Sequence, residues 1–290
     1  MFNTNTPVQK VQSKIADEHG VHLYLKRDDL IHPFVSGNKW RKLKYNVEEA
    51  KRSGKIGILT YGGAYSNHLI ATACACAAQG LKSIGIVRGE ELNPTSNLVL
   101  RMCYEYGMDL RFVPRSQYRE AKKGLDQAVG FFTVPEGGDN ELGVEGCEEI
   151  LSKDESYDHI IVAVGTGTTF TGLINASHHS CQVHGIAAMK QADYLKDYIR
   201  SRVQSQNWKL HTDYAFNGFG KYTDELLGFM RLFTTQTGIL LDPVYTGKMM
   251  WATYDLIRKG LVKEGESVLC VHTGGLTGIL TDDWRQSLVG

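Results

Sequence analysis

Short runs of β-branched and other apolar residues alternate along this chain with helix-length amphipathic segments, a pattern typical of parallel α/β folds. The predicted strands span 56–61, 83–87, 110–113, 131–134, 159–164, 184–188 and 268–272. The predicted helices span 67–79, 96–106, 117–129, 141–151, 223–235 and 248–259. No internal repeat or proline-rich linker interrupts the series. We therefore expect an α/β protein built from open, mostly parallel, twisted sheets flanked by helices.

The charge balance argues against nucleic acid as a partner. The chain carries 32 Lys+Arg and 32 Asp+Glu, so it has no net field to attract a polyanion. No apolar run reaches the roughly 18 to 20 residues of a membrane span, and the segment 1–20 is polar. The 6 cysteines are scattered through apolar runs, as expected of reduced, buried thiols. We expect a cytoplasmic protein with neither nucleic acid nor membrane as a partner.

Glycines follow several of the predicted strands. They are Gly62 and Gly63, Gly137 and Gly138, Gly165 and Gly167, and Gly274 and Gly275. Open parallel sheets bind ligands beyond the carboxyl ends of their strands. The glycines therefore predict a single cleft lined by backbone.

The segment Val-Gly-Thr-Gly-Thr-Thr-Phe-Thr-Gly at 164–172 follows a hydrophobic strand and opens a predicted helix. Small residues let backbone amides converge on an anion, and the helix dipole adds positive potential. The segment lacks the Gly-Lys-Ser/Thr ending of a P-loop and the G-x-G-x-x-G spacing of a dinucleotide site. It predicts a phosphate cup, and a glycine-rich turn without a ligand is the alternative.

A second segment, Ser-Gly-Asn-Lys-Trp-Arg-Lys at 36–42, contains two lysines. If Gly37 precedes a helix, Lys39 and Lys42 lie three residues apart on one face. Lysines are usually solvated, so a surface role is the alternative. Beside a phosphate cup, however, one amine can form a Schiff base with an aldehyde cofactor while the other holds the phosphate.

A third strand end, Gly-Gly-Ala-Tyr-Ser-Asn-His at 62–68, leads into a predicted helix. Ser66 or Asn67 could serve simply as the N-cap. The amides of such a helix start also suit a substrate carboxylate. Ser66 and His68 are two residues apart and do not face each other on a helix, so a hydrolase dyad is a poor explanation.

Six motifs together resemble one enzyme family. They are Lys-Arg-Asp-Asp-Leu at 26–30, Gly-Asn-Lys-x-Arg-Lys-Leu at 37–43, Gly-Gly-x-x-Ser-Asn-His at 62–68, the cup at 165–172, Asp-Pro-Val-Tyr-Thr-Gly-Lys at 242–248 and His-Thr-Gly-Gly at 272–275. In order and spacing they look like the pyridoxal-phosphate (PLP) enzymes of the 1-aminocyclopropane-1-carboxylate deaminase and D-cysteine desulfhydrase family. The resemblance runs from about residue 26 to residue 275.

The resemblance implies a tryptophan-synthase-β-like fold with two domains, a larger PLP-binding domain at 1–45 and 141–290 and a smaller inserted one at 46–140. The catalytic residues would be Lys39, which bonds the cofactor aldehyde, with Ser66 and Tyr245. The cofactor would also contact Lys42, Asn67, Gly165, Thr166, Gly167, Thr168, Thr169, Tyr245 and Thr273. Ser66, Asn67 and His68 would bind the substrate. A hydroxyl at the ring nitrogen, from Thr273, cannot hold a proton there as a carboxylate can, which favours elimination.

His68 and Thr273 resemble the desulfhydrase branch, which favours a lyase that converts D-cysteine to pyruvate, ammonia and sulfide. The alternative within the family is a deaminase, classed as a hydrolase, that converts 1-aminocyclopropane-1-carboxylate to 2-oxobutanoate and ammonia. Gly218-Phe219-Gly220 stands where both branches carry a tyrosine between glycines. A homologue that binds cofactor or amino acid without turnover therefore stays open, as does a nucleotide- or sugar-phosphate-binding enzyme that uses the cup without PLP. The family implies a homodimer.

His178, His179, Cys181 and His184 form a dense local group. The group lacks a second Cys/His pair at zinc-site spacing, so no metal is expected there.

Overall fold

The computed structural model describes residues 2–124, 128–152, 154–276 and 279. The strands are β1 (Val8–Lys10), β2 (His22–Lys26), β3 (Gly57–Gly63), β4 (Lys82–Arg88), β5 (Met108–Val113), β6 (Phe131–Thr133), β7 (His159–Val164), β8 (Gln182–Ala187), β9 (Trp208–His211) and β10 (Ser267–Val271). The α-helices are α1 (Lys14–Glu18), α2 (Asn38–Arg52), α3 (Asn67–Ala78), α4 (Leu98–Glu105), α5 (Tyr118–Gly124), α6 (Glu141–Glu148), α7 (Thr168–Ala176), α8 (Tyr194–Arg200), α9 (Asp224–Thr237) and α10 (Thr246–Arg258). Short 3-10 helices lie at Asp28–Leu30 and Glu136–Gly138.

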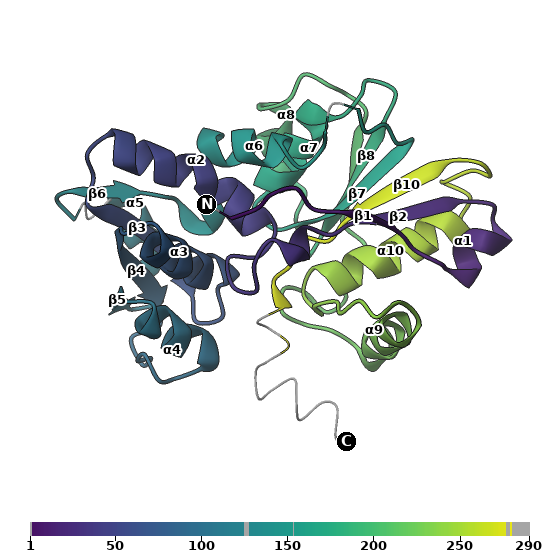
Figure 1. Cartoon of the computed structure of the whole chain (residues 1–290). Helices are drawn as coiled ribbons and strands as arrows, with labels where there is room; N and C mark the ends of the chain where they lie inside the picture. The colour runs from purple at the N-terminus through teal and green to yellow at the C-terminus, as the bar shows by residue number, and fades with distance from the viewer. Residues whose placement is uncertain (1, 125–127, 153, 277–278, 280–290) are drawn as a thin grey trace.

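The strands form two separate sheets, which lie in the two lobes of Figure 1. The 6-stranded sheet has the order β1-β2-β10-β7-β8-β9 and is parallel except for the edge pair of β1 and β2. The 4-stranded sheet has the order β5-β4-β3-β6 and is parallel throughout. This confirms the expected fold class of two mostly parallel sheets flanked by helices.

Both faces of the larger sheet are covered, and all residues of its central strand β7 are buried. Helices α9 and α10 pack on one face, and α6, α7 and α8 cover the other (Figure 1). A strand buried on both faces reads as a continuous hydrophobic run, as Ile160–Val164 does. In the smaller sheet α2, α3 and α4 pack on one side and α5 on the other.

The observed elements match most of the predicted ones to within a few residues. The strands β1, β2 and β9 and the helices α1 and α8 were not predicted, and helix α2 was considered only as a condition for placing Lys39 and Lys42 on one face. The helix predicted at 117–129 is observed as α5, which ends at Gly124, and positions 125–127 lie outside the described residues.

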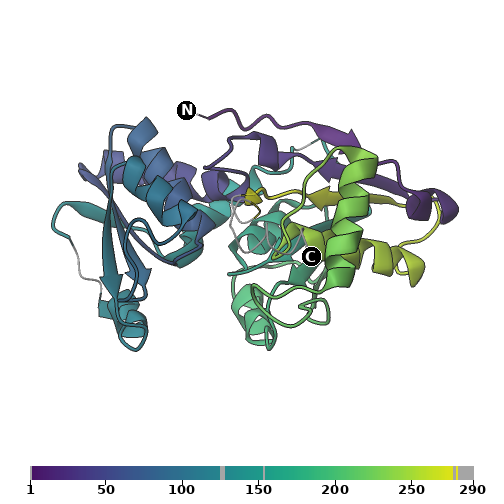
Figure 2. The same cartoon turned by 90° about the horizontal axis from the view of Figure 1, so that it is seen from below.

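The strands divide between the two sheets by their position along the chain. Those of the smaller sheet all lie within 46–140, and those of the larger sheet lie outside that range. Helix α2 spans the junction at residue 45, so the exact domain boundaries stay a prediction. Figure 2, seen from below, shows the two lobes side by side.

Three histidines line up across the larger sheet. His184 Nε2 lies 3.0 Å from His159 Nδ1, and His184 Nδ1 lies 3.0 Å from His211 Nε2. His159 Nε2 in turn contacts Glu266 at 2.9 Å. All three rings are buried. His184 therefore belongs to this histidine row and not to a cluster with its sequence neighbours.

Within the described ranges, no group of three or more His, Cys, Asp and Glu side chains is arranged to hold a metal ion. All six cysteines are unpaired and buried. No helix in this part of the chain has the length and apolarity to cross a bilayer.

Candidate active site

A cavity of 980 Å³ lies between the two lobes. Its walls come from the carboxyl ends of strands of both sheets, including β3, β4, β7 and β10, and from the start of α2. Of the residues predicted for the site, the following line it: Lys39, Lys42, Ser66, Asn67, His68, Gly165, Thr166, Gly167, Thr169, Tyr245 and Thr273. Thr168 lies behind the wall and is fully buried. The structure thus brings together segments that are far apart in the sequence.

Lys39 and Lys42 lie in the first two turns of α2, with both side chains at the cavity. Lys42 is 3% exposed, so the surface alternative does not apply to it, and its Nζ donates to the carbonyl of Gly137 at 3.2 Å and to Thr166 Oγ1 at 3.4 Å. The Lys39 amine makes no hydrogen bond or ion pair with the described residues. Desolvation, together with the neighbouring Lys42 cation, lowers the pKa of Lys39 to about 7. A free amine near neutral pH is a nucleophile and a base.

The predicted cup surrounds the start of α7. Gly167, the N-cap, has a φ of +95°, which a residue with a Cβ rarely adopts. The first amides of the helix have no partner inside it and point into the cup. A Cβ at Gly165 would lie 3.3 Å from the Tyr245 ring, so the glycine lets the aromatic ring approach the cup closely.

Asp242 fixes the backbone that carries Tyr245. Its carboxylate accepts from the amides of Val244 and Tyr245 at 2.9 Å and from the amide of Thr246 at 2.8 Å. These contacts fix the turn that leads into α10 and hold Tyr245, the N-cap residue of that helix, at the cavity wall. Burial raises the pKa of the Tyr245 phenol, which therefore stays protonated.

Ser66 is the N-cap of α3, since its Oγ accepts from the Leu69 amide at 3.3 Å. His68 is buried, and its Nε2 lies 2.8 Å from Thr60 Oγ1. Thr60 donates its only hydroxyl proton to the carbonyl of Val134. His68 must therefore donate from Nε2 to Thr60 Oγ1. Its Nδ1 is then an acceptor, and it has no hydrogen-bond partner among the described residues. Burial, with the charges of Lys39 and Lys42, lowers the pKa of His68 well below its ordinary value.

Thr273 lies in the loop after β10, which packs against the start of α2. The Gly275 amide donates to Ser36 Oγ at 2.8 Å, and the Asn38 amide donates to the Thr273 carbonyl at 3.3 Å. A Cβ at Gly275 would lie 3.0 Å from the Asn67 side chain. The loop thus places Thr273 in the same cavity as Lys39 and Asn67.

Phe219 also lines the cavity and is 57% exposed. Its ring meets the Tyr245 ring edge to face, with centroids 6.0 Å apart. The wall therefore presents an apolar ring at the position where a tyrosine would present a hydroxyl. Tyr222 lines the same cavity.

Sequence patterns did not reveal several residues that support the site. Lys248 is 1% exposed and donates to the carbonyls of Ala188 at 3.1 Å, Ala215 at 2.9 Å and Gly218 at 3.0 Å. It ties the end of β8 to the loop that carries Phe219. The motif at 242–248 contained Lys248 and Asp242. The partners of Asp242 are its sequence neighbours, but those of Lys248 are distant in sequence and only the fold identifies them.

These residues fit a phosphorylated aldehyde. The cup supplies amides for an anion, Lys42 supplies a cation, and Lys39 supplies an unpaired amine. Between them lies an orphaned buried acceptor, His68 Nδ1, which is available to a ligand. An amine and an anion cup in one cavity define a class of enzyme that works through a carbonyl cofactor that carries a phosphate group.

Comparison with known proteins identifies that class. A family model described as pyridoxal-phosphate dependent enzyme matches residues 1–274. The chain is 32% identical over 303 aligned positions to a protein of Pyrococcus abyssi that is provisionally named a 1-aminocyclopropane-1-carboxylate deaminase, covering 94% of this chain and 90% of that protein. It is 30% identical over 308 positions to the mitochondrial bifunctional D-cysteine desulfhydrase/1-aminocyclopropane-1-carboxylate deaminase of Arabidopsis thaliana, covering 94% of this chain and 77% of that protein.

A solved structure described as an ACC deaminase homologue superposes with a TM-score of 0.82 at 30% identity, covering 98% of this chain and 93% of that one. The chain belongs to the family of pyridoxal-phosphate dependent enzymes, and its cofactor is pyridoxal phosphate. This confirms the resemblance seen in the sequence motifs and sets aside the nucleotide-binding alternative.

Proposed function

We propose that this chain is a lyase that removes the amino group and the β-substituent of a small amino acid, with D-cysteine as the first substrate to test. The observation that carries the proposal is the unpaired Lys39 amine, which shares one cavity with the anion cup and the amides at the start of α3. The names of the relatives, a bifunctional desulfhydrase/deaminase among them, support the same substrate class.

The site residues divide the work as follows. When bound, pyridoxal phosphate supplies an aldehyde for amines and a ring that withdraws electrons from the substrate α-carbon. Lys39 Nζ would bond the cofactor aldehyde, and the Lys39 amine would accept the α-proton, for which its lowered pKa of about 7 suits it. Lys42 and the α7 amides bind the phosphate, and the start of α3 binds the substrate carboxylate. Because His68 Nδ1 is an acceptor, the carboxylate contact comes from backbone amides and not from this ring atom.

The remaining contacts orient the ring of the cofactor. Asn67 would hold its phenolic oxygen, Tyr245 would pack against the ring, and Thr273 would contact the ring nitrogen, as the family resemblance implies; all three line the cavity. Ser66, which lines the same cavity, would assist ring opening of a cyclopropane substrate. A threonine hydroxyl at the ring nitrogen limits electron withdrawal, which favours rapid loss of a β-substituent such as sulfide.

The test is an assay of the purified protein with D-cysteine, L-cysteine and 1-aminocyclopropane-1-carboxylate, while sulfide, pyruvate and 2-oxobutanoate are measured. We expect sulfide and pyruvate from D-cysteine. Formation of 2-oxobutanoate alone would identify the deaminase alternative. A change in the cofactor absorption spectrum without any product would identify a binding homologue, and Phe219→Tyr would then test whether the missing hydroxyl is the cause.

We also propose that the protein is a cytoplasmic homodimer. Six unpaired, buried thiols are typical of a reducing compartment, and two-fold assemblies are the commonest oligomers. Sedimentation and cell fractionation test the two statements separately.

A further inference from the structure

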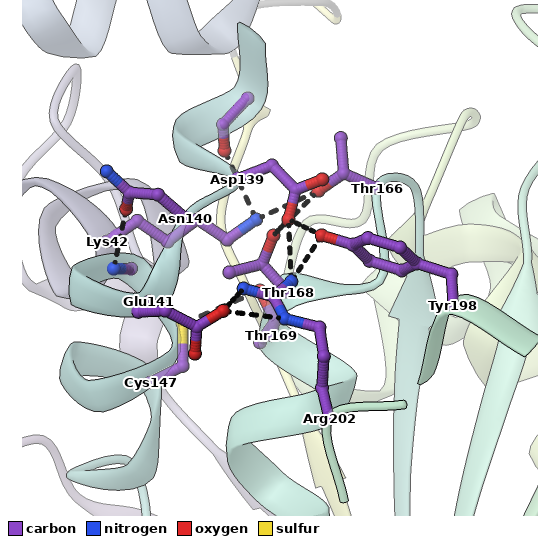
Figure 3. A network of polar contacts seen from close by, with 12 residues as sticks. Lys42, Asp139, Asn140, Glu141, Cys147, Thr166, Thr168, Thr169, Tyr198 and Arg202 are labelled. Atoms are coloured by element: carbon purple, nitrogen blue, oxygen red, sulfur yellow. Dashed lines mark hydrogen bonds and ion pairs between the residues drawn. The ribbon is translucent and has the colours of Figure 1, made fainter. Parts of the chain in front are cut away.

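Asp139 lies outside the cavity wall, directly behind the cup. It follows the 3-10 turn Glu136–Gly138, and its side chain is 22% exposed. One of its oxygens, Oδ1, accepts three hydrogen bonds: from Thr168 Oγ1 at 2.7 Å, from the Tyr198 hydroxyl at 2.7 Å and from Arg202 Nη1 at 3.2 Å (Figure 3). The other oxygen makes no hydrogen bond with the described residues.

The contacts continue from Asp139 into the cup. Thr168 Oγ1 lies 3.0 Å from Thr166 Oγ1, and Lys42 Nζ lies 3.4 Å from Thr166 Oγ1 (Figure 3). A lysine ammonium can only donate, and a carboxylate can only accept. These four side chains form a row of hydrogen bonds, and the two charged ends impose one direction of donation on it. Lys42 donates to Thr166, Thr166 to Thr168, and Thr168 to Asp139.

This direction determines what the cup offers an anion. Thr166 and Thr168 give their only hydroxyl protons to neighbours and have none left for a ligand. Thr169 differs, because its Oγ1 accepts from Asn38 Nδ2 at 2.9 Å and keeps its own proton to donate. The donors in the cup are then the amides of α7, the Thr169 hydroxyl and the Lys42 ammonium.

The charge of Asp139 is balanced locally. Arg202 is 12% exposed, contacts Asp139, and forms a second ion pair with Glu141 at 2.6 Å. By Coulomb's law alone, removal of the carboxylate would strengthen the binding of a phosphate dianion. Removal of its hydrogen bonds would weaken it, because the Thr168 hydroxyl would lose its acceptor and Thr166 its fixed orientation.

We propose that Asp139 is a positioning residue for the phosphate of the cofactor. It orients the Thr166–Thr168 hydroxyl row and thereby the Lys42 ammonium, and it fixes the cup to α8 through Tyr198. The inference rests on the proposed function in one respect, namely that the cup binds the phosphate.

The experiment compares the affinities of the apoprotein for pyridoxal phosphate and for pyridoxal, which lacks only the phosphate. The ratio of the two dissociation constants measures how much the cup contributes to binding through the phosphate. A loss of affinity that is common to both ligands cancels in this ratio. Asp139→Ala removes the acceptor. Asp139→Asn removes the charge but keeps Oδ1 for the three donors. Asp197→Asn removes an exposed carboxylate of α8 and serves as the control.

We expect Asp139→Ala to reduce the preference for pyridoxal phosphate by roughly tenfold or more, and Asp139→Asn to stay within roughly threefold of the parent and of Asp197→Asn. Thr168→Val breaks the same row without touching Asp139, so it replaces Asp139→Ala if that variant does not fold, and the same loss is expected. An unchanged or increased preference in Asp139→Ala, or an equal loss in Asp139→Asn, would overturn the positioning role.

The failure of the underlying site has a different signature. If the parent protein binds pyridoxal and pyridoxal phosphate equally, the cup does not hold the phosphate and the proposed function fails with it. If Lys42→Met abolishes the preference while Asp139→Ala and Thr168→Val keep it, only the role of Asp139 fails.

Discussion

Gly37 and Thr273 lie so close together that a Cβ atom at position 37 would stand 1.9 Å from the Thr273 carbonyl oxygen. Gly37 also has a φ of +55°. This backbone contact joins the helix that carries Lys39 to the loop that carries Thr273, and it adds to the hydrogen bond from the Gly275 amide to Ser36 Oγ.

The glycine contact predicts the effect of a single methyl group. We expect Gly37→Ala to lower the free energy of unfolding by about 3 kcal/mol or more, because the backbone must move as well as adopt a strained φ. Gly54→Ala, beyond the other end of α2, has a similar φ of +66° but open space around it, and should cost only about 1 kcal/mol. Urea unfolding measures both. Equal losses would mean that the contact with Thr273 does not matter.

A buried ion pair connects two of the sequence motifs. Arg41 Nη2 donates to Asp28 Oδ1 at 2.9 Å and Arg41 Nε donates to Asp28 Oδ2 at 3.0 Å, with both side chains at most 2% exposed. We expect Arg41→Met to destabilise the fold by about 3–5 kcal/mol, since it leaves a buried carboxylate unpaired. On the same helix Arg52 is 78% exposed, and Arg52→Met should change stability by less than about 0.5 kcal/mol. Denaturant titration would contradict this if the two variants behaved alike.

The lowered pKa of Lys39 predicts the pH dependence of cofactor attachment. Only the neutral amine attacks an aldehyde, so the rate of adduct formation with pyridoxal should rise with pH and level off above a midpoint near 7. Lys42→Met removes the cation that helps to lower this pKa, and the midpoint should move to higher pH. Pyridoxal is used because it makes no phosphate contact with Lys42. A midpoint that is the same in both proteins would show that the two amines do not interact.

The row of histidines predicts a loss of stability in acid. Burial, with neighbouring positive charges that include Lys209, lowers the pKa of His184 to about 3 and that of His211 to about 4. His184 contacts His159, which in turn contacts Glu266. The charge of Asp213 raises the pKa of His211, and that of Lys259 lowers it. Below the ordinary histidine pKa of 6.5, His184 and His211 bind protons in the unfolded chain but stay neutral in the folded chain.

The free energy of unfolding should therefore fall as the pH drops below 6.5, by up to about 1.4 kcal/mol per pH unit for each histidine. Urea unfolding at a series of pH values measures the slope. His184→Gln should reduce it, while His178→Gln, at an exposed turn, should not. If neither variant changes the slope, the row does not govern the acid response.

The architecture was largely predictable from the sequence because strands buried on both faces are continuous apolar runs. The run at 159–164 coincides with β7, whose neighbours β8 and β10 cover both edges. The edge strands β1 and β9, of three and four residues, were not predicted. At such positions pairing with a neighbour, and not an apolar pattern, determines the conformation.

The predicted site residues share one cavity except for Thr168, whose side chain turns away toward Asp139. Motifs mark residues at strand ends, and parallel strands bring their ends together, which is why the prediction works. The motifs do not reveal supports such as Lys248 and Asp139. Their partners, at 188, 215 and 218 and at 168, 198 and 202, become neighbours only in the fold.

The most direct test of the account is the identity of the lysine that bonds the cofactor. The protein loaded with pyridoxal phosphate is reduced with borohydride and digested, and the labelled peptide is sequenced by mass spectrometry. The account predicts a label on Lys39 alone, and its loss in Lys39→Ala while the cup still binds the phosphate. A label on Lys42 or Lys248, or none on any lysine, would contradict it.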